Sequence, residues 1–93
     1  PGCGYTGVAC YAFTGAAYAG QEEAVCSELS AGMEAEGNPA FEYFASGCPS
    51  GAYGGCEFDD PAYPDQEYML YYYDGLAGGE SDCGSNGGTW TSL

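Results

Sequence analysis

Six cysteines constrain this chain more strongly than any other feature of its 93 residues. Their spacing contains no CxxC pair, and the sequence has no histidine that could join them at a metal. Structural zinc sites ordinarily use closely spaced ligand pairs, so this pattern favours three disulfide bonds. Disulfides persist in oxidising compartments, and we therefore expect a secreted, extracellular protein. The six residues are Cys3, Cys10, Cys26, Cys48, Cys56 and Cys83.

The supply of aliphatic core residues is thin. Leu, Val and Phe together make ten residues and there is no Ile, whereas there are ten Tyr. So few aliphatic residues beside a net charge of −14 would ordinarily indicate disorder. Disulfides, worth about 2–4 kcal/mol each, and large aromatic rings offset this deficit. We therefore expect residues 1–93 to form a single disulfide-stabilised domain.

The charge balance excludes several kinds of partner. The chain has 14 Asp and Glu but no Lys, Arg or His. Without cationic side chains it cannot neutralise nucleic-acid phosphates or anionic lipid headgroups. No apolar run reaches the length that membrane insertion requires. The expected partners are copies of the chain itself, a basic protein or neutral carbohydrate.

One amphipathic helix is predicted over residues 20–37. Apolar residues recur there at helical spacing, and a Gly-Asn stop signal precedes Pro39. The expected buried stripe is Val25, Cys26, Leu29 and Met33. The side chains expected to face solvent are Glu23, Ser27, Ser30 and Glu34.

Strands are predicted over residues 6–13, 66–73 and 89–93. Residues 66–73 are apolar or aromatic on both faces, so this strand should be central in a sheet or covered by another copy. Residues 40–45 fit a short helix or a strand. Residues 57–65 should be irregular, and residues 75–88 flexible except at Cys83. The fold class is therefore α+β, with one main helix packed on a short, mostly antiparallel sheet.

The disulfide pairing stays open, because six cysteines allow 15 combinations. Cys48 and Cys56 bracket a glycine-rich loop, so they are the expected local pair. Cys26 should tie the helix to a neighbouring strand.

Catalysis is hard to build from this residue set. Without His or Lys there is no ordinary general base near neutral pH, and only paired carboxylates remain. Asp59 with Asp65 is one such pair, but 14 acids in 93 residues produce near neighbours by chance. We therefore expect no enzymatic activity, and an acidic hydrolase is the weakest alternative.

One acidic stretch has the oxygen ligands that calcium prefers. Its spacing is not that of an EF-hand, and a solvated acidic loop is the favoured reading. No other cofactor is expected. The five candidate ligands are Glu57, Asp59, Asp60, Asp65 and Glu67.

Tyrosines form the candidate interaction surface, since ten of them exceed what one small core can hide. The alternative is that tyrosine replaces aliphatic core residues. The abundance of Gly, Ala and Tyr favours a structural subunit that self-associates into an extracellular fibre or layer. The alternative function is a binding module or effector that acts on a partner protein or carbohydrate. The surface residues are Tyr63, Tyr68, Tyr71, Tyr72 and Tyr73.

Overall fold

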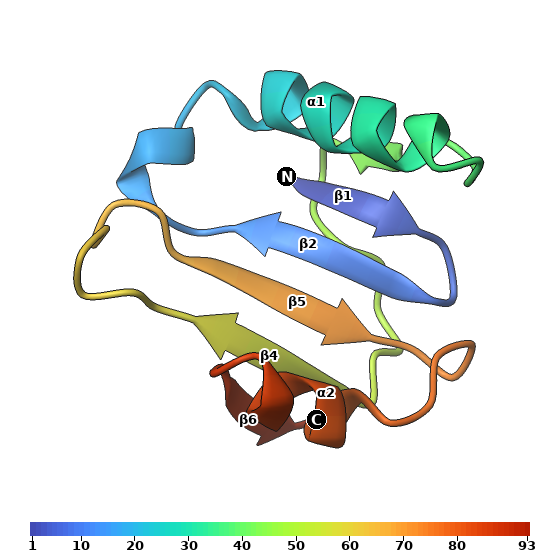
Figure 1. Cartoon of the computed structure of the whole chain (residues 1–93), viewed down its shortest axis with the longest axis vertical. Helices are drawn as coiled ribbons and strands as arrows, with labels where there is room; N and C mark the ends of the chain where they lie inside the picture. The colour runs from blue at the N-terminus through green and yellow to red at the C-terminus, as the bar shows by residue number, and fades with distance from the viewer.

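A computed structural model describes all residues 1–93 and confirms the α+β class (Figure 1). A six-stranded sheet with the order β3-β1-β2-β5-β4-β6 is antiparallel at every pairing. The strands are β1 (Gly2–Tyr5), β2 (Ala9–Phe13), β3 (Glu42–Phe44), β4 (Gly54–Phe58), β5 (Tyr68–Tyr72) and β6 (Thr89–Ser92). The helices are η1 (Ala16–Tyr18), α1 (Glu22–Ala35) and α2 (Gly79–Ser85).

The strand predicted at residues 66–73 is confirmed as β5, in the middle of the sheet. It pairs with β2 on one side and β4 on the other, so that Leu70 lies opposite both Tyr11 and Cys56. A central position explains why both of its faces carry apolar side chains. The short terminal strand is also confirmed, as β6.

Two predictions at the strands need correction, and the structure decides a third position that was left open. The strand expected at residues 6–13 starts at Ala9, because Gly7 turns the chain with a φ of 76° and residues 2–5 form β1. Residues 57 and 58, expected to be irregular, end β4. Residues 40–45, for which helix and strand were both open, contain β3 at the edge beside β1.

The prediction that residues 75–88 are flexible is wrong, because they contain α2. This helix has only seven residues and includes two glycines, so its local propensity is weak. Tertiary contacts form it: Cys83 is bonded to Cys56 of β4, and Gly79 lies against the Tyr72 ring.

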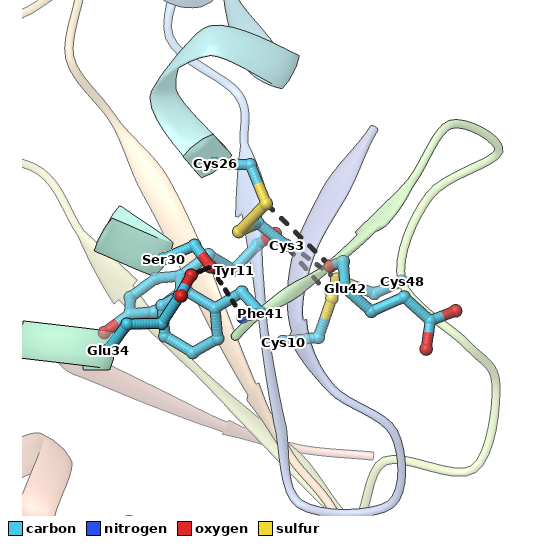
Figure 2. The surroundings of a disulfide bond; sticks show 9 residues. All are labelled: Cys3, Cys10, Tyr11, Cys26, Ser30, Glu34, Phe41, Glu42 and Cys48. Atoms are coloured by element: carbon cyan, nitrogen blue, oxygen red, sulfur yellow. Dashed lines mark hydrogen bonds between the residues drawn. A yellow bond between two sulfur atoms is a disulfide. The ribbon is translucent and has the colours of Figure 1, made fainter. Parts of the chain in front are cut away.

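The main helix lies within the predicted range, but its buried side differs. Gly37 adopts a φ of 86° and Asn38 N–H donates to the Met33 carbonyl at 3.0 Å, a common helix stop. Ser30, expected to face solvent, is buried, whereas Leu29 is 37% exposed. The reason is a polar contact: Phe41 N–H donates to Ser30 Oγ at 2.9 Å (Figure 2).

All six cysteines are paired, and the expected Cys48–Cys56 bond is wrong. The bonds are Cys3–Cys26, Cys10–Cys48 and Cys56–Cys83. Cys10 and Cys56 lie on opposite faces of the sheet. Cys56, Leu70 and Tyr11 are paired across neighbouring strands and therefore share one face. Cys10 is the neighbour of Tyr11 in β2 and therefore points to the other face. The Cys26 bond to β1 confirms that the helix is tied to a strand.

Both helices cover the same face of the sheet, which we call the helix face. A single row of paired residues crosses all six strands on this face. In this row Cys3 of β1 is bonded to α1, and Cys56 of β4 is bonded to α2. The helices therefore lie towards opposite edges of the sheet and leave β2 and β5 between them (Figure 1). The row is Tyr43, Cys3, Tyr11, Leu70, Cys56 and Trp90.

Replacing Gly54 by Ala should destabilise the domain. A Cβ there would lie 2.0 Å from a carbon of the Trp90 ring, so the tryptophan must move. We expect Gly54→Ala to lower the free energy of unfolding by about 1–3 kcal/mol in urea denaturation. The control is Gly32→Ala in α1, where a Cβ meets open space and helix propensity should raise stability by about 0.5–1 kcal/mol. Equal stability of the two variants would contradict the packing of Trp90 on Gly54.

Candidate functional site

The helix face carries a continuous set of aromatic side chains between α1 and α2. Each is half-buried: it is packed on one side and open on the other. They come from β1, β2, β4, β5, η1 and the segment before β3. We call this set the aromatic groove, and its members are Tyr5, Tyr11, Phe13, Tyr18, Phe41, Phe58 and Tyr68.

Ring contacts connect the whole groove, with Tyr11 at its centre. The Tyr11 ring centroid lies 5.8 Å from that of Tyr68 and 6.1 Å from that of Phe41. The Tyr68 ring stacks on Phe58 at 4.9 Å. Tyr5 packs on Phe41 at 4.7 Å and thereby extends the groove to β1. Phe13 continues the other branch: it lies parallel to Tyr11 and packs against Tyr18 at 5.0 Å.

Two adjoining cavities hollow the groove. One has a volume of about 330 Å³ and lies over the centre of the sheet, against Tyr11, Leu70 and Tyr72. The other, of about 520 Å³, lies between η1 and the loop that follows β4. Phe58, Tyr68 and Asn86 line both, so the two cavities adjoin.

Ser30 positions one wall of the groove. The hydrogen bond from Phe41 N–H to Ser30 Oγ fixes the backbone of Phe41 beneath α1. The Phe41 ring is thereby held between the rings of Tyr5 and Tyr11. Figure 2 shows Phe41 beside Tyr11 and Ser30. Tyr5 is anchored as well, since its hydroxyl donates to the Pro39 carbonyl at 2.6 Å.

The phenols of Tyr11, Tyr68 and Tyr72 stay neutral at physiological pH, because folding raises the pKa of each. Burial raises the pKa of Tyr11, and burial together with the neighbouring Tyr11 and Tyr18 phenols raises the pKa of Tyr68. Burial, and after it the Asp82 carboxylate, raises the pKa of Tyr72 in the floor of the groove. The site therefore presents ring faces and neutral hydroxyl groups.

The five tyrosines proposed from the sequence do not share one surface. Tyr63, 58% exposed, lines the larger cavity together with Tyr68. Tyr72 and Tyr73 are only 4% and 5% exposed and fill the core. Tyr71 alternates with Tyr72 along β5 and points to the opposite face.

Sequence reasoning missed most of the groove. Tyr11 and Phe13 alternate in β2, and this period of two was the available signal that they share a face. No local pattern indicated that β2 would lie beside β5, or that Phe41 would pack against Tyr11.

The structure brings three of the five candidate calcium ligands together. Carboxylate oxygens of Glu57, Asp59 and Glu67 lie within 4.8 Å of one another and could hold an oxygen-seeking cation. Asp60 instead accepts a hydrogen bond from Ala62 N–H at 2.9 Å, and Asp65 is not part of the cluster. Calcium binding here stays a prediction, as does the absence of catalysis by acid pairs.

Alkaline titration should show the buried phenols. The pKa values of Tyr11, Tyr68, Tyr72 and Tyr73 are raised by folding, so the folded chain keeps protons that the unfolded chain releases above a pH of about 10. The contribution of these protonated phenols to the free energy of unfolding is fully present below that pH and is lost as pH rises through the folded pKa values. Tyrosinate absorbance should therefore appear at a higher pH in the folded protein than in the reduced, denatured chain. Superimposable curves would contradict the packing of these rings.

No helix of this structure has the length and apolar character needed to cross a membrane. Comparison with protein families, characterised proteins and solved structures finds no match to this chain. Because a fold alone does not specify function, the functional argument depends on the groove and the charges around it.

Proposed function

We propose that this chain is a secreted, non-enzymatic binding module that holds its partner in the aromatic groove. One observation carries the proposal: seven contacting aromatic side chains stay half-exposed on one face of the sheet. Four of them, Tyr11, Tyr18, Phe58 and Tyr68, line the two adjoining cavities. The domain has a thin aliphatic core, so these rings would stabilise it more if fully buried. Exposed aromatic surface of this kind is typical of an interaction site.

The groove has the chemistry of a recognition surface. Tyr and Phe rings give a broad, rigid contact area at low cost in side-chain entropy, and phenol groups add polar tips. Such rings stack against sugar rings and against planar or apolar side chains of a protein. The partner is therefore a protein or a carbohydrate.

Secretion and the absence of catalysis are parts of the same proposal. Three disulfides support folding in an oxidising compartment. The side-chain set contains no His or Lys, which supports a role in binding over one in acid–base chemistry.

Self-association into a fibre or layer is the second candidate. The two edge strands, β3 and β6, each pair on one side only and could accept a strand from another copy. They are only three and four residues long, and a net charge of −14 on every copy opposes association at low salt. The groove therefore supports a foreign partner better than it supports a second copy.

Truncating the groove should weaken binding without unfolding the domain. We expect immobilised protein probed with glycan and peptide arrays to give hits that Tyr11→Leu and Tyr68→Leu weaken by about 2 kcal/mol, roughly 30-fold. The matched control is Tyr71→Leu, because this tyrosine lies on β5 but faces the other side of the sheet. Circular dichroism checks that all three variants stay folded.

Two results would count against this function. Equal binding by the Tyr68→Leu and Tyr71→Leu variants would place the contact outside the groove. Light scattering that shows concentration-dependent assembly, lost in the Tyr68→Leu variant, would favour self-association through the groove.

A further inference from the structure

We propose that the group seated in the larger cavity of the groove is the guanidinium or ammonium of an Arg or Lys side chain on a basic partner protein. This inference rests on the proposed function and names its ligand. The cavity of about 520 Å³ between η1 and the loop after β4 combines aromatic rings with carboxylates, and both attract a cation.

Four aromatic side chains line this cavity. Phe58 and Tyr68 form one wall as a stacked pair with centroids 4.9 Å apart. Tyr18 and Tyr63 complete the aromatic lining from two other segments of the chain. Ring faces carry partial negative charge, so rings gathered around a cavity bind cations better than they bind anions.

Two carboxylates line the same cavity, those of Asp59 and Asp60. The Asp60 side chain is held in place, since its Oδ1 accepts a hydrogen bond from Ala62 N–H at 2.9 Å. Glu57 and Glu67 lie against Asp59 and add negative charge nearby. Carboxylates and a guanidinium form charge-assisted hydrogen bonds, which are stronger than neutral ones.

No side chain of this protein can neutralise these carboxylates. The sequence has no Lys, Arg or His, so no side chain can form an ion pair with Asp59 or Asp60. The net charge of −14 also attracts a basic partner over distance and speeds its encounter. A neutral sugar could stack on the rings and donate hydroxyl hydrogen bonds to the carboxylates, but it would form no ion pair and would not be attracted over distance by the net charge.

The second cavity indicates why the cation belongs to a protein rather than to a free amine. It adjoins the first through Phe58 and Tyr68 and continues over Tyr11 and Leu70. A peptide with its cationic side chain in the larger cavity can lay the neighbouring residues along this apolar part. A small free cation would leave it empty.

Calorimetric titration of the full chain with three probes tests the inference. The probes are a capped pentapeptide with a central Arg between Leu residues, the same peptide with neutral citrulline in place of Arg, and a linear glucose oligosaccharide. We expect the Arg peptide to bind about tenfold more tightly than the citrulline peptide in low-salt buffer. This preference should shrink as salt rises, since screening acts over about 8–10 Å near physiological ionic strength.

Variants separate local charge from net charge. The double variant Asp59→Asn with Asp60→Asn should reduce the preference for Arg to about twofold or less. Asn at position 60 keeps the oxygen that accepts the Ala62 hydrogen bond, so the loop should keep its shape. The control, Asp74→Asn with Glu80→Gln, removes the same number of exposed charges elsewhere and should keep the preference.

The outcomes distinguish this inference from the proposed function. If the Arg and citrulline peptides bind equally, or only the oligosaccharide binds, and Tyr68→Leu abolishes that binding, the groove is a binding site and the cationic ligand is wrong. If none of the probes binds, the cationic ligand is also wrong, and the arrays then decide whether the groove binds anything. Equal loss of preference in the acidic double variant and in its control would show that net charge alone selects the peptide.

Discussion

Two disulfide bonds determine how this domain is arranged. Cys3–Cys26 and Cys56–Cys83 attach α1 and α2 to one row of residues that crosses the sheet. In a chain with few aliphatic residues these bonds replace much of the hydrophobic packing that ordinarily holds a helix on a sheet. Because the two attachment points lie towards opposite edges, the helices cannot meet over the centre. The central strands β2 and β5 are therefore left open between them.

The same residue type serves stability and, in the proposed function, recognition, and its position relative to the helices decides which. Tyr72 and Tyr68 lie on the same face of β5, four residues apart. Tyr72 is buried near α2 and packs 5.7 Å from the Trp90 ring, so it belongs to the core. Tyr68 lies at the other end of β5, stays half-exposed and lines both cavities of the groove.

The opposite face of the sheet is built for close covering instead. A Cβ at Gly2 would lie 2.7 Å from Cys48 Sγ, so only glycine lets the segment that carries Cys48 pack there. The Cys10–Cys48 bond holds this segment against the sheet. The two faces are thus different surfaces. The disulfide-bonded loop covers part of one face and leaves a cavity of about 530 Å³ beside Ala12 and Tyr71, whereas the other face is open between two helices. The partner site is proposed on the helix face because the connected set of aromatic rings lies there.

The count and spacing of the cysteines indicated that all six form disulfide bonds, without giving their partners. Local patterns in the sequence determined the α+β class, the main helix and the central strand. Each depends on residues a few positions apart, such as the helical stop at Gly37 or the apolar character of residues 66–73. The tertiary structure alone decided that Cys48 bonds to Cys10, that Ser30 faces inward, and that residues 79–85 form a helix. It also gathered Tyr11, Phe41 and Tyr68 into one groove. These outcomes depend on which strands lie side by side. The packing of the whole chain sets that order, because strands that are distant in sequence become neighbours only when the sheet forms.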